Sequence, residues 1–289
     1  MTDFDPRLTP ARADLAAAHL KGKVDAPRYA EGSERRVVAA SAPLKRTPAP
    51  DAGTDTELLF GEHFIVYDEH EGWAWGQSAG DSYVGYVSAN ALGPAGAPPT
   101  HTVAALRTYL YPAADLKTPP LALLSMNAAL TVTGKSTGNG GKFSACAFEG
   151  TTAFAFTDHL TPIGAYAEDY VCVAETFRGT PYLWGGRQSL GLDCSALVQM
   201  ALTRAGIACP RDTDMQEAAL GTALPEPADM RQLRRGDLIF WKGYVGIMVD
   251  ARHMLHANAT YMAVTVNPLA DFAARVRADA GPVTSVKRL

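Results

Sequence analysis

One cysteine of this chain stands where a nucleophile is easily activated. Cys194 lies in the segment GLDCSALVQMALTRAG, between an aspartate and a serine, where apolar residues begin to repeat with helical spacing. Asp193 is a preferred N-cap residue, so the pattern predicts a helix with the thiol in its first turn. Unpaired N–H groups and the helix dipole stabilise negative charge there, so we expect a thiol pKa below the ordinary value of about 8.5. The alternative is a small buried residue that only packs the helix.

The other three cysteines are interpreted as packing residues. Cys146 lies in a strand pattern, Cys172 within a helix pattern and Cys209 just past a helix. No CxxC spacing is present, so the sequence indicates neither a zinc site nor a small disulfide scaffold. We therefore expect free thiols and no metal or other cofactor.

Motifs on both sides of Cys194 carry a family resemblance. The segment GTPYLWGGRQSLGLDCSALV contains the cysteine, and GDLIFWKGYVGIMVD and HMLHANA follow it. Together they resemble the NlpC family of papain-like cysteine peptidases, which cut murein peptides, over roughly residues 165–289. The preceding β-rich blocks look like the bacterial SH3-like domains that many members carry. The segments LLFGE and SYVGYV are similar to a subgroup that handles small murein peptides with a free N-terminal L-Ala.

The resemblance implies a role for each matching position. It implies a nucleophile at Cys194, a phenol that helps to stabilise the oxyanion at Tyr182, and a residue that orients the catalytic histidine at His256. It also implies a pocket for the ligand's free ammonium group, built from four residues: Glu62, Tyr83, Asp193 and Ser195. An ammonium group needs carboxylates and hydrogen-bond acceptors, which these side chains supply.

Each of these assignments has a plainer structural alternative. Glu62 and Tyr83 could be surface charge and barrel packing, Asp193 only a helix cap and Ser195 only a first-turn residue. Thr213 could contact the substrate's N-terminal residue, although a short helix capped by Asp212 explains the same stretch.

The expected catalytic base is replaced by a phenol. The family places its histidine in a Gly-His-Val frame after the GDLIFW run, and here Tyr244 occupies that position, twelve residues before His256. A phenol with a pKa near 10 stays protonated at neutral pH. Loss of general acid–base help typically costs a factor of about 10² to 10⁴ in rate. His256 could reach the thiol only through a strand shift or a bridging water, and His253, three residues away, points to the opposite strand face.

The sequence predicts an α+β fold in which a papain-like cysteine peptidase domain follows two small all-β SH3-like barrels. Residues 1–55 are interpreted as a helix, from Thr9-Pro10 to Gly22, and an extended linker over 41–55. Strand patterns with turn signals place the barrels at residues 56–95 and 100–163. Residues 164–289 form the peptidase-like domain, with helical spacing over 166–177 and 194–205 and then four short strands.

Composition narrows the classes of partner. The chain has 289 residues, a net charge of -4 and 19% charged residues. This balance argues against a protein that coats nucleic acid and against a polybasic patch that binds membranes. The first 23 residues lack the layout of a signal peptide, and no stretch approaches the ~20 apolar residues of a membrane helix. We expect a cytoplasmic protein whose partner is a murein-derived peptide, with no nucleic-acid or membrane partner.

Three functions remain open at this stage. The first is an endopeptidase that cuts the γ-D-glutamyl–L-diamino acid bond of short peptides with a free N-terminal L-Ala, in murein peptide recycling. The second, motivated by Tyr244, is a pseudoenzyme that binds such peptides without turnover. The third is a scaffold whose SH3-like domains bind a protein partner.

Overall fold

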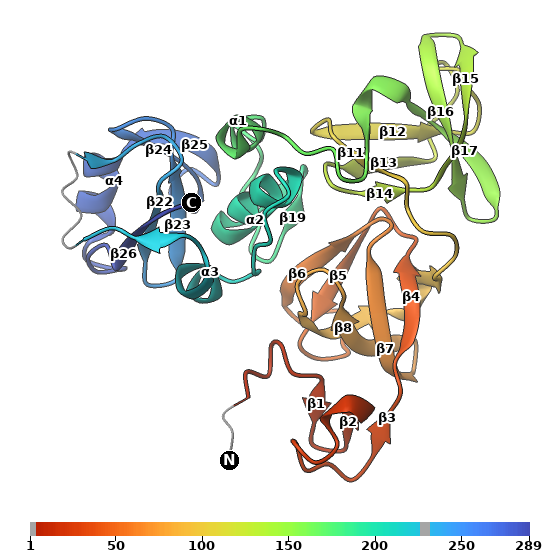
Figure 1. The fold of residues 1–289 in the computed structure, drawn as a ribbon, viewed down its shortest axis with the longest axis horizontal. Coiled ribbons are helices and arrows are strands. Elements are labelled where there is room, and N and C mark those ends of the chain that lie inside the picture. The colour runs from red at the N-terminus through yellow and green to blue at the C-terminus, as the bar shows by residue number, and fades with distance from the viewer. Residues whose placement is uncertain (1–3, 226–231) are drawn as a thin grey trace. The chain divides into compact units, whose positions relative to one another are not determined.

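The chain folds into two compact units, and the boundary between them in the sequence lies between Ile163 and Gly164 (Figure 1). The computed structural model describes residues 4–225 and 232–289. The first unit is built almost entirely from strands, and the second combines helices with one antiparallel sheet. None of the helices in these described ranges is long and apolar enough to cross a membrane.

The N-terminal segment forms strands where a helix is predicted. A small sheet joins β1 (Ala11–Arg12), β2 (Leu15–Ala17) and β3 (Tyr29–Ala30), and the 3-10 turn η1 (Ala18–Leu20) follows β2. The predicted helix from Thr9 to Gly22 is therefore wrong. A helix this short is marginal in water without a packing face. Strand pairing instead buries Ala16, Ala17 and Leu20 together.

The first barrel begins earlier than residue 56. Its seven strands are β4 (Ser33–Val37), β5 (Ser41–Lys45), β6 (Thr54–Leu59), β7 (His63–His70), β8 (Trp73–Ser78), β9 (Val84–Ser88) and β10 (Leu92–Pro94), with η2 (Ala89–Ala91) before the last. They pair in the order β10-β4-β7-β8-β9-β5-β6. The segment predicted as the start of a linker is thus strand β5, whose alternating Ala42 and Leu44 are 1% and 0% exposed.

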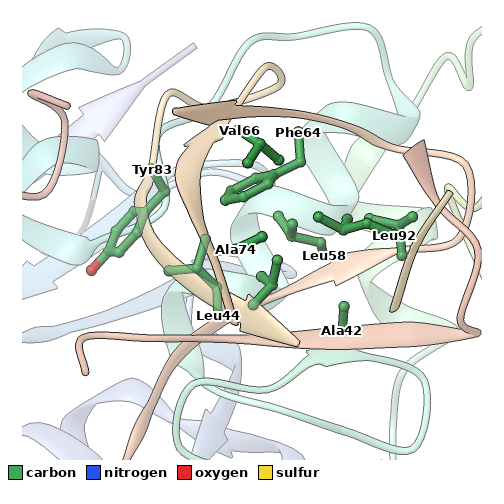
Figure 2. Close-up of a cluster of buried hydrophobic side chains, with 10 residues drawn as sticks. Ala42, Leu44, Leu58, Phe64, Val66, Ala74, Tyr83 and Leu92 are labelled. Carbon is green, nitrogen blue, oxygen red and sulfur yellow. The ribbon is translucent and has the colours of Figure 1, made fainter. Parts of the chain in front are cut away.

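An apolar cluster fills this barrel (Figure 2). Leu44, Leu58 and Phe64 are each 0% exposed and come from three different strands. Gly76 lets two strands approach closely, because a Cβ there would lie 2.1 Å from the carbonyl oxygen of Ile65. The barrel is consequently packed through its centre by side chains.

The second barrel occupies the rest of the first unit. Its strands are β11 (His101–Val103), β12 (Arg107–Tyr111), β13 (Ala122–Ser125), β14 (Ala129–Leu130), β15 (Val132–Gly138), β16 (Gly141–Phe148), β17 (Thr151–Phe156) and β18 (Leu160–Pro162), with η3 (Thr157–His159) before the last. They form sheets of order β14-β11-β18 and β13-β12-β17-β16-β15. The segment TGKSTGNGGK, residues 133–142, is rich in glycine, serine and threonine, which is typical of a hairpin tip, and it closes the β15–β16 hairpin.

The second unit places helices before its sheet. The elements are α1 (Tyr170–Glu175), β19 (Arg187–Gln188), β20 (Gly191–Leu192), α2 (Cys194–Arg204), α3 (Thr213–Ala219), β21 (Thr222–Ala223), β22 (Leu238–Trp241), β23 (Tyr244–Met248), β24 (His253–Asn258), β25 (Ala263–Pro268), α4 (Leu269–Val276) and β26 (Ser285–Arg288). The larger sheet has the order β21-β26-β22-β23-β24-β25, and α2 packs on β23 and β24. The four predicted strands are confirmed as β22 to β25, whereas the helix predicted over 166–177 is shorter.

Truncation of a core leucine tests the packing of the first barrel. Leu58→Ala should lower the free energy of unfolding by about 2–5 kcal/mol, because it leaves a cavity in a filled core. The matched control is Leu121→Ala in the same unit, where the side chain is 48% exposed and little change is expected. Urea denaturation of the three proteins measures the difference, and equal losses for both variants would contradict this description of the core.

Candidate active site

Helix α2 begins at the candidate nucleophile. Asp193 is its N-cap residue, and one carboxylate oxygen accepts a hydrogen bond from the backbone N–H of Ala196 at 2.9 Å. Cys194 is therefore the first residue of the helix, as the sequence predicts, and it is 6% exposed. Its sulfur lies 3.9 Å from the hydroxyl oxygen of Thr213, the first residue of α3. The thiol thus faces polar groups although it is buried.

The pKa of Cys194 is raised, which contradicts the expectation from the helix N-terminus. Burial is the main cause and the negative charge of Asp193 adds to it, so the pKa of the thiol rises to about 11. The backbone N–H of Val245, the Thr213 hydroxyl and the Arg211 guanidinium oppose this shift without cancelling it. Desolvation of the thiolate therefore outweighs the helix dipole, and the sulfur is protonated at neutral pH.

Asp193 and Ser195 form a buried network with a residue that the sequence did not single out. Arg211 is 1% exposed and makes a two-pronged ion pair with Asp193, with N–O distances of 3.0 and 2.6 Å. Its guanidinium also donates to the Ser195 hydroxyl at 2.8 Å. Asp193 accepts a further bond from the backbone N–H of Gly185 at 3.0 Å. Any ammonium group that binds Asp193 must share this carboxylate with Arg211.

Tyr182 presents a phenol that stays protonated. Burial raises its pKa, and the Asp193 carboxylate, together with the Cys194 thiolate where it forms, raises it further. Its backbone pairs with Leu192 and donates to the carbonyl of Met262 at 2.9 Å, which fixes it beside the start of α2. A protonated phenol in that position is a hydrogen-bond donor, as oxyanion stabilisation requires.

A chain of hydrogen bonds sets the orientation of the amide of Asn267. The backbone N–H of Tyr261 donates to Oδ1 of Asn258 at 2.9 Å, so Nδ2 of Asn258 is the group that donates to the Thr265 hydroxyl at 2.8 Å. That hydroxyl in turn donates to Oδ1 of Asn267 at 2.7 Å. The carbonyl oxygen of Asn267 is therefore an acceptor.

His256 is held between this acceptor and the phenol that replaces the expected base. Its Nε2 lies 2.9 Å from Oδ1 of Asn267 and must donate to it, so Nε2 carries the ring proton. Nδ1 then presents its lone pair to the Tyr244 hydroxyl, which lies 2.6 Å away and also 3.0 Å from the carbonyl of Ala257. Tyr244 thus directs its proton toward His256.

Both members of this pair are uncharged at neutral pH. Burial lowers the pKa of His256 to about 4, an effect that its bond to Asn267 only partly opposes, and the Phe272 ring packs on the imidazole at 4.4 Å. The pKa of Tyr244 lies well above its ordinary value, chiefly because of burial. His253 lies on the other strand face beside Asp250, as the sequence predicts.

Glu62 and Tyr83 belong to the other unit. The Glu62 carboxylate accepts a hydrogen bond from the backbone N–H of Leu59 at 2.9 Å. Tyr83 is 3% exposed beside the barrel core, and Figure 2 shows its hydroxyl turned away from that cluster. The second unit therefore gathers Tyr182, Asp193, Cys194, Ser195, Thr213, Tyr244 and His256, whereas a role for Glu62 and Tyr83 stays a prediction.

Sequence reasoning missed two residues of this site. Arg211 opens the segment RDTDMQ, and no local pattern tells whether such an arginine is exposed or pairs with a buried carboxylate. Asn267 follows Thr265 by two positions in β25, so period two places both on one face, and His256 pairs with Thr265 across the strands. The strand register, which the sequence does not state, was needed to bring Asn267 to His256.

Comparisons with known proteins identify the two parts. Residues 179–276 match the model of the NlpC/P60 family, and residues 44–92 match that of the bacterial dipeptidyl-peptidase SH3 domain. The chain carries an NlpC/P60 domain and a bacterial SH3 domain. The predicted α+β, papain-like fold is thereby confirmed.

Similar proteins include bacterial peptidases. The chain is 33% identical to dipeptidyl-peptidase 6 of Lysinibacillus sphaericus over 112 residues, which are 39% of this chain and 40% of the relative. It is 32% identical to γ-D-glutamyl-L-lysine dipeptidyl-peptidase of Bacillus subtilis over 114 residues, 36% of each chain. The matches thus span about two fifths or less of these two relatives.

Solved structures extend the likeness to most of the chain. An NlpC/P60 family protein from Bacillus cereus superposes with a TM-score of 0.70 at 18% identity, covering 89% of this chain and 99% of its own. An NlpC/P60 endopeptidase from Photobacterium damselae gives a TM-score of 0.61 at 13% identity, covering 88% and 71%. At these identities the likeness concerns the fold.

The neutral state of His256 predicts a pH-dependent stability. The unfolded chain binds a proton at this ring near pH 6.5, whereas the folded chain binds it only near pH 4. The free energy of unfolding should therefore fall by about 3 kcal/mol as the pH drops through this window. His256→Gln should lose this part of the dependence in urea denaturation at pH 7 and 4.5. The control His253→Gln, on the same strand, should behave like the wild type; an unchanged dependence in His256→Gln would contradict the buried neutral ring.

Proposed function

We propose that this protein binds short murein peptides at the Cys194 site and hydrolyses their γ-D-glutamyl–L-diamino acid bond slowly. The observation that carries the proposal is the arrangement at the start of α2 within an NlpC/P60 domain, where Cys194 is the first helical residue and the backbone of Tyr182 pairs with Leu192 just before it. The similar Bacillus protein whose name specifies γ-D-glutamyl-L-lysine supports the substrate class. Turnover of such peptides is a step of murein peptide recycling.

The reaction follows from the side chains present. The Cys194 sulfur, once deprotonated, attacks the γ-carbonyl carbon, and the carbonyl oxygen becomes an oxyanion that the Tyr182 hydroxyl stabilises by donating a hydrogen bond. Collapse of this intermediate breaks the C–N bond, and the diamino acid leaves with a proton on its amine. Water then attacks the thioester, which releases the γ-D-glutamyl product and restores the thiol.

The ligand's free amine sets the length of the peptide. Asp193 and Ser195 bind the ammonium group in this proposal, with Thr213 near the N-terminal residue of the peptide, and the family resemblance assigns the same role to Glu62 and Tyr83 of the other unit. Because Asp193 already pairs with Arg211, an ammonium group bound there shares this carboxylate with the guanidinium. A pocket that binds a chain end selects short peptides with an unmodified N-terminus.

Proton transfer limits the rate. No imidazole of the described residues bonds to the Cys194 sulfur, since the His256 nitrogens bond to Tyr244 and Asn267. A thiol with a pKa of about 11 is only about one part in 10⁴ thiolate at pH 7. The leaving amine also lacks the acid that an imidazolium supplies.

A second candidate function is binding without turnover. The short bond between Tyr244 and His256 favours it, because the phenol occupies the place of the base and binds the ring that could replace it. In this case the site is a receptor for murein peptides.

Restoring the histidine separates these two functions. With L-Ala-γ-D-Glu-L-diamino acid tripeptide, Tyr244→His should release free diamino acid about 10² to 10⁴ times faster than the wild type, because it restores general acid–base help. Mass spectrometry of the product measures the rate. Tyr166→His, at a tyrosine that is 60% exposed in the same unit, is the control for a new histidine. Slow release by the wild type supports the hydrolase, and tight binding without release supports the receptor.

The role of Cys194 itself has a direct control. Cys194→Ala should abolish release in both the wild-type and the Tyr244→His background. Persistent release in Cys194→Ala would rule out the proposed nucleophile.

The ammonium pocket predicts a preference that calorimetry can measure. Cys194→Ala should bind the free tripeptide and should bind its N-acetylated form at least tenfold more weakly, because acetylation removes the positive charge. Glu62→Gln should reduce this preference, whereas Glu69→Gln, at an exposed position of the same barrel, should keep it. Equal affinity for the two peptides would refute the pocket, and the absence of any binding would leave only the scaffold interpretation.

A further inference from the structure

The N-cap of α2 has two opposing effects on the nucleophile. The Asp193 carboxylate satisfies the Ala196 N–H of the first turn, which stabilises the helix that presents Cys194. The same carboxylate is a negative charge next to the sulfur, and it raises the pKa of the thiol. A catalytic thiolate and an N-cap aspartate are therefore in electrostatic conflict.

Arg211 is placed to resolve this conflict. Its guanidinium engages both carboxylate oxygens of Asp193, at 3.0 and 2.6 Å, and is 1% exposed. Its charge acts on Cys194 in the direction opposite to that of Asp193. Because the pair is shielded from solvent, each charge acts on the sulfur with little screening.

The segment that carries Arg211 is itself fixed to the start of α2. Gln216 is 0% exposed, and its Nε2 donates to the carbonyls of Ser195 and Pro210, both at 2.9 Å. Arg211 also donates to the Ser195 hydroxyl at 2.8 Å. The beginnings of α2 and α3 are thus joined by hydrogen bonds on both sides of the guanidinium.

The other groups that face the sulfur are neutral. Two phenols, Tyr182 from the loop before β19 and Tyr244 from β23, have raised pKa values and stay protonated. The Thr213 hydroxyl of α3 and the Val245 N–H of β23 complete its surroundings. Asp193 and Arg211 are the charged side chains with the largest effect on the pKa of Cys194 among the described residues.

We propose that Arg211 is a positioning residue for Cys194, which cancels the Asp193 charge beside the sulfur and holds the N-cap carboxylate against the first turn of α2. The proposal rests on Cys194 being the nucleophile of the proposed function. Arg211 acts on the sulfur through its ion pair with Asp193.

The test is the pH dependence of Cys194 alkylation by iodoacetamide in the full chain, followed on the Cys194 peptide by mass spectrometry. Arg211→Gln should move the midpoint to higher pH and slow alkylation at neutral pH about tenfold for each pKa unit gained. Asp193→Asn should move the midpoint to lower pH, because the guanidinium charge is then uncompensated. The double variant should lie between the two single variants. A change in access to the sulfur alters the maximal rate but leaves the midpoint in place.

Opposite shifts distinguish this role from a purely structural one. Two single variants that shift the midpoint in the same direction, or not at all, overturn the proposal. Arg288→Gln is the matched control, because it removes an equivalent two-pronged pair with buried Asp237, at 2.7 Å for both contacts, from the same unit. It should leave the midpoint unchanged, and Arg211→Lys should restore most of the shift.

A second comparison applies if Arg211→Gln does not fold because the buried Asp193 carboxylate has lost its arginine. Asp193→Asn and the double variant both lack that carboxylate and differ only in the charge at position 211. Asp193→Asn should have the lower midpoint, and equal midpoints overturn the proposal. Alkylation needs no peptide, so an absence of hydrolysis leaves this result intact and counts only against the proposed function.

Discussion

Burial of the Cys194 sulfur at the start of α2 is the constraint on which the chemistry of this protein depends. A helix N-terminus stabilises a thiolate, whereas burial by the surrounding side chains destabilises it by removing water. The balance of these two effects sets the pKa of the thiol. Here the sulfur is buried, with the Thr213 hydroxyl and the backbone N–H of Val245 as neutral donors, and the raised pKa of the thiol reflects that burial. An imidazolium next to the sulfur would offset the cost of burying the charge. With tyrosine at position 244, the remaining compensation comes from the weaker neutral donors and from a guanidinium that is itself paired.

The same enclosure explains why His256 does not substitute for the absent base. The ring is 0% exposed, and its two nitrogens are satisfied by a phenol and an amide. Protonation at Nδ1 would place a positive charge in a buried site beside the Phe272 ring and would require Tyr244 to give up its role as donor. The tyrosine at position 244 thus donates to the neighbouring histidine, which stays in its neutral form. Under the proposed function, this coupling makes position 244 the one on which turnover depends.

Buried charge is handled in two ways in the second unit. Asp193 and Asp237 are each paired with an arginine through two contacts, which is the arrangement that compensates a desolvated carboxylate. Cys194 and His256 instead remain neutral, because burial disfavours their charged forms. The two buried aspartates thus each have a guanidinium that contacts both carboxylate oxygens, and the candidate nucleophile is adjacent to one of these pairs.

The sequence by itself determined the order of the parts and the local setting of the thiol. Aspartate before a helical repeat predicts the start of α2, and alternating apolar residues predict β22 to β25, because these signals depend only on neighbouring residues. The N-terminal strands, the true start of the first barrel and the raised pKa of Cys194 were decided by the tertiary structure. The reason is that these features depend on contacts between residues far apart in the chain, such as the pairing of β4 with β7 and the ion pair of Arg211 with Asp193. No pattern of neighbouring residues predicts such contacts. The sequence therefore shows which side chains are able to react, and the packing around them sets the free-energy cost of the charged form of each.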